Sequence, residues 1–368
     1  MIYLNSKGDK MRVTNLEVDI NNFKYNINNI KKYIGDKAIM PVIKANAYGT
    51  YLNKRIDLIN EFEIVAVAIV DEAIELRKLG YKKEILVLNQ PYEEEIDNIL
   101  KYDITIGLSE KSFLFSLKNI NSKIRVHLEI ETGMNRTGIS LEDLDNFIKI
   151  VKENPNILVE GIYTHLSSAD CDINYTKHQL NKFKQAVLIT KQVFNNIKYI
   201  HSSASNGLLN YPDNLSNIVR PGIIMYGYKS NDFEEKIDIK PICKLKTRIT
   251  FLKEVDIGES IGYGRSFITN KKMKIATIPI GYADGLKRNL SNKGEVVVNN
   301  QKVKIIGNIC MDSCMIDVTN INNLRIGDIV YIFDNDLITI DDIANLCNTI
   351  NYEVLCTISD RVPRIYID

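Results

Sequence analysis

Eight short apolar segments alternate with helix-like segments through the first 230 residues, and this alternation constrains the fold most strongly. The segments are mostly continuous apolar runs, as expected for parallel strands buried on both faces. They span residues 38–45, 64–70, 84–90, 103–109, 124–131, 159–166, 198–204 and 218–227. Eight strands alternating with helices predict a (β/α)₈ TIM-like barrel, and a doubly wound open sheet is the alternative.

The segments between these runs carry helix signals. Residues 70–80 have apolar side chains at helical spacing, acidic residues early, basic residues late and a glycine at the end. Residues 141–155 have a similar pattern that ends at a proline, and residues 175–194 form a third candidate. The first part of the chain is therefore predicted to be of the α/β class.

After about residue 235 the chain changes character. Short strand candidates at 244–255, 273–282, 294–300, 301–310, 313–320, 328–334 and 353–359 are separated by turn signals. Only residues 341–350 have a helical pattern there. We therefore expect two domains, a barrel over residues 1–235 and a mainly β domain over residues 236–368.

Composition excludes several functional classes. Lys plus Arg number 47 and Asp plus Glu 46, so a formal net charge of +1 gives no electrostatic case for nucleic acid or an anionic membrane as partner. No apolar run approaches the 18 or so residues of a membrane span, and the first residues lack the apolar core of a signal peptide. A cytoplasmic location is therefore expected.

The six cysteines predict reduced thiols that pack as small apolar groups. They are scattered along the chain without a Cys-x-x-Cys pair. Cys310 and Cys314 are four residues apart, but no histidine lies near them to complete a zinc site. No metal site is predicted.

Polar residues at the ends of the predicted barrel strands are the candidates for chemistry, because these ends meet on one face of a barrel. A lysine ending an apolar strand either reaches water or, when desolvated, acts as a Schiff-base nucleophile. The arginines, Ser205 and nearby backbone amides could bind a phosphate and an anionic ring oxygen, or form ordinary surface ion pairs. In chain order these residues are Lys44, Arg136, His165, Ser203, Ser205, Asn206, Arg220, Gly222 and Ile223.

Several of these residues lie in stretches that are similar to motifs of the alanine racemase family of pyridoxal-phosphate enzymes. The chain has eight such stretches, and through them it resembles that family. They span nearly the whole sequence in the family's order. The stretches are PVIKANAYG (41–49), ETGMNRTG (131–138), GIYTHLSSAD (161–170), VRPGIIMYG (219–227), IGYG (261–264), IPIGYADG (278–285), CMDSCMIDV (310–318) and SDRVPRIY (359–366). The resemblance implies a barrel followed by a β domain. It also implies a head-to-tail homodimer in which the partner's second domain completes each active site.

The resemblance also implies roles for individual residues. Lys44 would hold pyridoxal phosphate covalently and act as one acid/base, and Tyr263 from the other subunit would be the opposite one. Arg220 would contact the pyridine nitrogen with support from His201, and Arg136 would contact the phenolic oxygen. Phosphate contacts would come from Tyr48, Ser205, Gly222 and Ile223, and His165 would orient Tyr263. Substrate contacts would come from Arg136, Met311, Tyr282 and Asp360.

These residue types suit racemisation. Two bases on opposite sides of a planar carbanion remove the α-proton on one face and return it on the other, while the cofactor supplies an electron sink. An arginine at the ring nitrogen leaves that nitrogen unprotonated, which disfavours side reactions. Arg136 is a candidate cation to assist Tyr263, whose unperturbed pKa is about 10.

The chain departs from the family pattern at several positions. Glu129 stands where the family commonly has a carbamylated lysine, so it either substitutes for that anion beside Arg136 or faces outward. Asp360 replaces a tyrosine that touches the phosphate and narrows the site, unless it turns away to pair with Arg361 or Arg364. Thr50-Tyr51 replaces His-Gly, and Asn308 replaces an entrance arginine.

The resulting prediction is reversible conversion of L-alanine to D-alanine, which would supply peptidoglycan synthesis. Because of Asp360, racemisation of serine or a broader set of amino acids is the alternative. A decarboxylase of the same fold type would pair the ring nitrogen with a carboxylate and use a cysteine from the partner, which Arg220 and Tyr263 argue against. A non-catalytic cofactor-binding barrel would lack the β domain.

Overall fold

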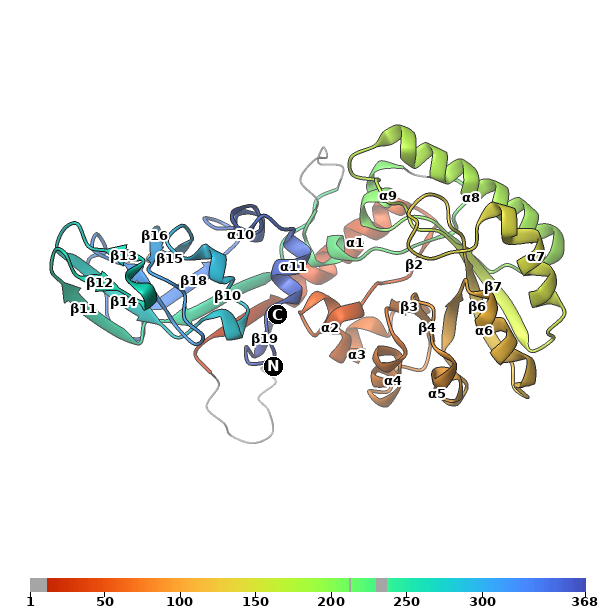
Figure 1. Ribbon diagram of the computed structural model, residues 1–368, viewed down its shortest axis with the longest axis horizontal. Coiled ribbons are helices and arrows are strands. Elements are labelled where there is room, and N and C mark those ends of the chain that lie inside the picture. Colours follow the sequence, from red (N-terminus) through yellow and green to blue (C-terminus); the bar gives the residue numbers. More distant parts are fainter. Residues whose placement is uncertain (1–11, 212, 230–236) are drawn as a thin grey trace.

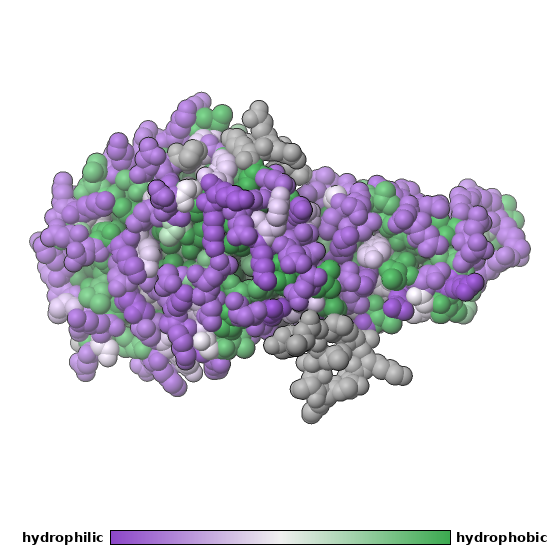
Figure 2. Space-filling model, turned by 180° about the vertical axis from the view of Figure 1, so that it is seen from behind, coloured by the Kyte–Doolittle hydropathy of each residue, from purple (hydrophilic) through white to green (hydrophobic). Residues whose placement is uncertain are grey.

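The molecule consists of two lobes that follow one another along its long axis (Figure 1). The structure is a computed structural model that describes residues 12–211, 213–229 and 237–368. The face shown in Figure 2 is dominated by hydrophilic residues, with apolar residues interspersed among them. None of the helices in the described part of the chain is long and apolar enough to cross a membrane.

The first lobe is the predicted barrel. Strands β3 to β8 form a parallel sheet in chain order, and β2 pairs in parallel with β9. A bridge between Val42 and Ala66 joins the β2 segment to β3, and the Arg220 N–H donates to the Ser203 carbonyl at 2.9 Å beside β8. The strands thus follow one another around a closed ring, which confirms the barrel over the open sheet. Their bounds are β2 Ala38–Ile39, β3 Ile64–Val67, β4 Glu84–Val87, β5 Thr105–Leu108, β6 Ile124–Glu129, β7 Ile157–Tyr163, β8 Tyr199–His201 and β9 Ile218–Val219.

Helices cover the outside of the barrel. The three predicted helices correspond to α4 (Val70–Lys78), α7 (Leu141–Lys152) and α8 (Ile173–Val193). α7 begins where the Ser140 hydroxyl accepts a hydrogen bond from the Asp143 N–H, and its buried side chains recur at helical spacing. The other barrel-lobe helices are α1 (Ile20–Ile34), α2 (Lys44–Tyr48), α3 (Ile56–Ile59), α5 (Ile96–Lys101), α6 (Lys111–Ser116) and α9 (Ser205–Asn210).

The second lobe is mainly β, as predicted. Its main sheet has nine strands in the order β11-β14-β17-β16-β15-β18-β10-β1-β19. The bounds are β1 Asn15–Asp19, β10 Cys243–Arg248, β11 Phe251–Val255, β14 Met273–Ile278, β15 Glu295–Val298, β16 Gln301–Ile306, β17 Cys314–Asp317, β18 Ile329–Phe333 and β19 Arg364–Ile367. A separate pair joins β12 (Ser260–Ile261) to β13 (Phe267–Ile268).

Strand β1 departs from the predicted division of the chain. Residues 15–19 fall within the predicted barrel domain, 1–235, yet β1 pairs antiparallel with β10 and parallel with β19 in the second lobe. Its alternating burial, with only Leu16 and Val18 fully covered, matches a half-exposed sheet and differs from the continuous apolar barrel strands. The predicted boundary after residue 235 lies outside the described residues.

A second correction concerns residues 353–359, which we expected to form a strand. Residues Asn351–Cys356 form helix α11, which follows α10 (Ile340–Cys347). Its buried Val354 and Leu355 belong to the hydrophobic core. A short apolar run does not distinguish a strand from a buried helical turn, and packing decided between them here.

Candidate active site

A cavity of about 320 Å³ opens at the C-terminal ends of the barrel strands. Most of the predicted cofactor residues line it, together with Glu129 from the end of β6 and Tyr352 from α11. Ile223 is fully buried and does not line it. The predicted residues in the wall are Lys44, Tyr48, Arg136, His165, Ser205, Arg220 and Gly222.

Lys44 directly follows the buried residues Val42 and Ile43 and is the first residue of α2, beyond the end of β2. Burial lowers the pKa of its amine, and the nearby Arg136 lowers it further, while Glu72 and Cys356 act in the opposite direction. A lowered pKa increases the fraction of neutral amine, which is the nucleophilic form.

The backbone after Lys44 turns in the left-handed sense. Residues 45–48 have φ between 51° and 56°, although none of them is glycine. Each such residue costs about 1–2 kcal/mol and persists only where its surroundings hold it. The Ala45 N–H donates to the Glu72 carboxylate at 2.6 Å, and the Gly49 N–H donates to the Ala45 carbonyl at 2.9 Å. The lysine is therefore presented on a strained turn that these contacts stabilise.

Arg220 is only 2% exposed, and its guanidinium contacts residues at the carboxyl ends of β7 and β8. Nη1 donates to Nδ1 of His201 at 2.5 Å and to the His201 carbonyl at 3.0 Å, and Nη2 donates to the Thr164 carbonyl at 2.8 Å. Burial lowers the pKa of Arg220 to about 10, which still leaves it charged at neutral pH. The predicted support of Arg220 by His201 is thus present.

Tyr163 contributes to the site although the sequence analysis did not single it out. The Arg220 guanidinium carbon lies 5.4 Å from its ring centroid, and the His201 ring stacks on it at 5.0 Å. Its hydroxyl donates to the Leu88 carbonyl at 2.8 Å. Its place inside the matched stretch GIYTHLSSAD, two residues before His165, was the signal that could have found it.

Glu129 faces inward. Its side chain is buried in the cavity wall and accepts a hydrogen bond from the Thr137 hydroxyl at 2.9 Å. Burial raises the pKa of this carboxyl, whereas Thr137 and Arg136 act to lower it. The inward position is the one required for a partner of Arg136, and the outward-facing alternative does not hold.

His165 lines the cavity as a neutral ring. Burial lowers its pKa to about 3, and the positive charges of Arg220, Arg136 and Lys44 act in the same direction. A neutral imidazole next to three cationic side chains can accept or relay a hydrogen bond without adding charge.

One wall of the cavity can hold a phosphate group. The Ser205 hydroxyl accepts a hydrogen bond from the Gly222 N–H at 3.1 Å and keeps its own hydrogen to donate. A Cβ atom on Gly222 would lie 2.3 Å from the Tyr48 hydroxyl, so only glycine fits between these groups. Burial raises the pKa of Tyr48 well above its ordinary value, so the phenol remains a hydrogen-bond donor.

Three predicted site residues lie on the other lobe and do not line the cavity. We call them the exposed patch: Tyr263, Tyr282 and Met311, which are 72%, 43% and 53% exposed. Gly262 and Gly264 take φ of 71° and 69° around Tyr263, whose carbonyl accepts a hydrogen bond from the Asn308 amide at 2.8 Å. The Tyr282 N–H donates to the Cys310 carbonyl at 3.1 Å, which places it beside Met311.

Asp360, which was predicted as a substrate contact, lies apart from the other predicted residues of the cavity. Asp360 is exposed, does not line the cavity, and accepts a hydrogen bond from the Tyr51 hydroxyl. The Arg364 guanidinium carbon stacks 4.6 Å from the Tyr51 ring centroid, while Arg361 pairs with Asp312 at 2.7 Å. The two departures from the family pattern, at positions 51 and 360, therefore contact each other between the lobes.

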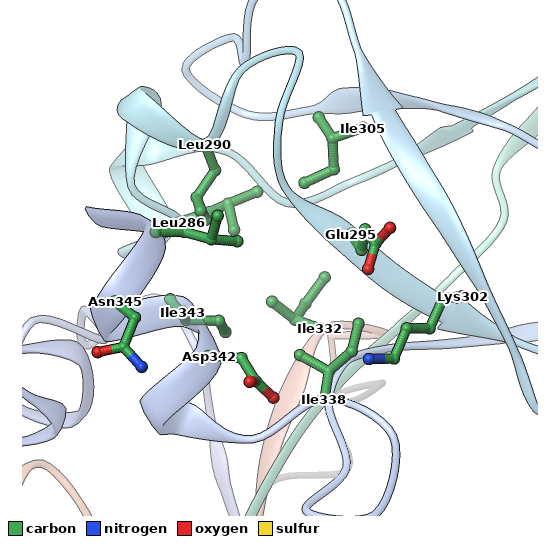
Figure 3. Close-up of a pocket in the computed structure, with 11 residues that line it drawn as sticks. Leu286, Leu290, Glu295, Lys302, Ile305, Ile332, Ile338, Asp342, Ile343 and Asn345 are labelled. Atoms are coloured by element: carbon green, nitrogen blue, oxygen red, sulfur yellow. The ribbon is translucent and has the colours of Figure 1, made fainter. Parts of the chain in front are cut away.

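A second cavity, of about 420 Å³, lies within the β lobe (Figure 3). Aliphatic side chains from the sheet and from α10 line it, with Glu295, Lys302 and Asp342 among them, and none of the predicted site residues does so. In the described ranges no group of three or more His, Cys, Asp or Glu side chains could hold a metal ion.

Comparisons with known proteins agree with this geometry. The family models for the N-terminal and C-terminal domains of alanine racemase match residues 18–230 and 242–366. An alanine racemase of Clostridium kluyveri is 41% identical, with 95% of this chain and 93% of that protein covered. One from Halothermothrix orenii is 40% identical, with 96% and 97% covered.

The solved structures extend the likeness to the fold. An alanine racemase from Clostridium difficile 630 superposes with a TM-score of 0.90 at 34% identity, covering 98% of this chain and 97% of the other. The two family models together cover both lobes, and the superposition with the solved structure also extends over both. The chain belongs to the alanine racemase family.

Proposed function

We propose that this protein interconverts L-alanine and D-alanine with pyridoxal 5′-phosphate as cofactor. One observation carries the proposal: a desolvated lysine and a buried arginine line the same cavity at the carboxyl ends of the barrel strands. The arginine would contact the ring nitrogen of the cofactor. The hydroxyl of Ser205 and the phenol of Tyr48 supply donors for a phosphate.

The residues present fit this cofactor. Lys44 would bind it covalently through Nζ, and Arg136 would contact its phenolic oxygen. Ser205, Tyr48 and the backbone at Gly222 and Ile223 would hold the phosphate. When bound, the cofactor would supply the sink for the electron pair left behind by the departing α-proton.

The chain's own residues would move the proton. The Lys44 amine, with its lowered pKa, would serve as the acid/base on one face of the substrate. The partner subunit's Tyr263 would serve on the opposite face, because Tyr263 lies on the exposed patch and not in the cavity of its own chain. The partner's Tyr282 and the partner's Met311 would approach with it. This arrangement supports a homodimer with shared active sites.

Alanine is favoured over serine. The serine alternative needed the Asp360 carboxylate beside the substrate, but that carboxylate is outside the cavity and accepts the Tyr51 hydroxyl. We further propose that the product supplies D-alanine for peptidoglycan and that the protein acts in the cytoplasm. The family to which the chain belongs supports these two points.

A direct assay tests the proposal. Purified protein loaded with pyridoxal phosphate should form D-alanine from L-alanine without releasing carbon dioxide, and it should act on L-serine much more slowly. Borohydride should fix the cofactor on Lys44, and Lys44→Ala should abolish racemisation, whereas Lys54→Ala at an exposed lysine should not. Labelling of a different lysine, or release of carbon dioxide, would contradict the proposal.

A further inference from the structure

A line of polar side chains runs from Arg220 through the barrel interior to the opposite end of the strands. Arg220 Nη1 lies 2.5 Å from His201 Nδ1, and His201 Nε2 lies 2.9 Å from His127 Nδ1. On its far side, His127 Nε2 faces Glu84 Oε1 at 3.8 Å. Glu84 is the first residue of β4, so the line crosses the barrel from its carboxyl end to its amino end.

The chemistry of Arg220 fixes the direction of every hydrogen bond in this line. A guanidinium has only donors, so His201 Nδ1 must accept and its proton must lie on Nε2. That Nε2–H then donates to His127, so Nδ1 of His127 accepts and its proton also lies on Nε2. Both rings are therefore neutral, and the His127 N–H is directed at the Glu84 carboxylate.

At the amino end of the strands, the described residues offer the His127 Nε2–H no hydrogen-bond acceptor that would compete with Glu84. His127 Nε2 and Glu84 Oε1 are both buried, and within the described part of the chain neither has any hydrogen-bond partner. At 3.8 Å their contact is electrostatic and longer than a hydrogen bond. The other carboxylate oxygen of Glu84 accepts from the Tyr199 hydroxyl at 2.8 Å and from Lys198 at 3.3 Å.

The charges at the two ends of the line are opposite. Burial by itself raises the pKa of Glu84, whereas the hydrogen bond from the Tyr199 hydroxyl and the charge of Lys198 lower it, so Glu84 is a carboxylate at neutral pH. Burial lowers the pKa of both His127 and His201, consistent with two neutral rings. A carboxylate thus stabilises, through two oriented imidazoles, an arginine that is buried without a carboxylate among its hydrogen-bond partners.

We propose that His127 and Glu84 are positioning residues for Arg220, acting through His201 in a one-way hydrogen-bond chain. The carboxylate orients His127, His127 holds His201 as the acceptor tautomer, and His201 fixes the guanidinium at the place proposed for the ring nitrogen. The consequence for catalysis rests on the proposed function, whereas the tautomers of the two rings do not.

Nitrogen-15 NMR of the cofactor-loaded chain tests the tautomers directly, because the sequence contains only 4 histidines. His127 and His201 should both be neutral with the proton on Nε2 between about pH 6 and pH 9, and the exposed His178 serves as the internal reference. Single His→Gln replacements assign the signals. The titratable or charged groups facing the pair are Glu84, Tyr163, Lys198, Tyr199 and Arg220. A protonated ring, or a proton on Nδ1 of either ring, would overturn the proposal.

A matched pair of variants tests the role of the carboxylate. Glu84→Gln removes the charge at constant size and should lower kcat for alanine about 10-fold, with little change in KM, and shift the nitrogen-15 signal of His127 Nε2, which faces the carboxylate. Tyr199→Phe removes the other neutral partner of Glu84 and should change kcat less than about twofold. Equal effects of the two variants, or an unchanged His127 spectrum in Glu84→Gln, would overturn the proposal. Failure of the unmodified enzyme to racemise alanine would count against the proposed function, and the tautomers would still be measured.

Discussion

The barrel cavity and the exposed patch of the β lobe are built in opposite ways. In the cavity, strand ends bring buried groups together, and burial shifts the pKa values of Lys44, His165 and Arg220. In the exposed patch, loop turns with positive φ present Tyr263 to the solvent. The cavity is preorganised within one chain, whereas the catalytic use that we propose for the patch requires a second subunit to approach it.

The largest effect is expected from variants that test whether the cavity of one subunit and the exposed patch of the other form one active site. Lys44→Ala and Tyr263→Phe should each lower racemisation at least about 100-fold, since each removes one of two bases. When the two inactive chains are mixed and exchange subunits, activity should partly return, because one site of the mixed dimer then has both bases. The measurement is D-alanine formation before and after mixing.

A mixture of each variant with itself is the control. In Tyr263→Phe, proton removal from L-alanine should suffer more than removal from D-alanine. Absence of recovered activity despite demonstrated subunit exchange would show that the cavity and the patch do not form one site.

The next effect concerns the cavity alone. Gly222→Ala places a Cβ against the Tyr48 hydroxyl, at 2.3 Å before relaxation, and should weaken cofactor binding about 10-fold. Gly294→Ala in the β lobe is the matched control, because Gly294 does not line the cavity and its new Cβ would lie 3.0 Å from the Leu290 side chain. Cofactor fluorescence titration measures both. Equal affinities for the two variants would remove Gly222 and Tyr48 from the proposed phosphate site.

A smaller effect follows from the burial of His165. Its folded pKa of about 3 lies below the unfolded value of about 6.5, so between these pH values only the unfolded chain binds the proton. The free energy of unfolding should therefore fall as pH drops from about 6.5, by at most about 1.4 kcal/mol per pH unit for this residue. His165→Gln should reduce that slope in denaturant titrations, whereas His178→Gln on the surface should not. An unchanged slope in His165→Gln would show that the ring is not buried as a neutral group.

The smallest effect is expected between the lobes, at the contact of Tyr51 with Asp360. Because Asp360 is exposed and outside the cavity, Asp360→Tyr should leave the serine-to-alanine ratio of kcat/KM within about twofold. Tyr51→Phe should change the free energy of unfolding by less than about 1 kcal/mol. A clear loss of serine activity in Asp360→Tyr would restore Asp360 as a specificity residue.

Local patterns in the sequence predicted most of the fold and of the cavity. Continuous apolar runs separated by capped amphipathic segments are short-range signals, so the eight barrel strands and helices α4, α7 and α8 were recognisable. Since parallel strands of a barrel end on one face, the residues following them could be expected to converge. Lys44, Arg136, His165 and Arg220 do converge.

The tertiary structure alone decided features that depend on partners far along the chain. β1 pairs with strands more than 200 residues away, and Tyr51 meets Asp360 across 309 positions. The line from Arg220 to Glu84 likewise joins four separate strand segments. The sequence determined which segments form strands and which residue types stand at their ends, because periodicity and propensity act over a few residues. Which side chains meet was decided only by the closure of the barrel and its packing against the β lobe, since a contact pair leaves no local pattern in either segment.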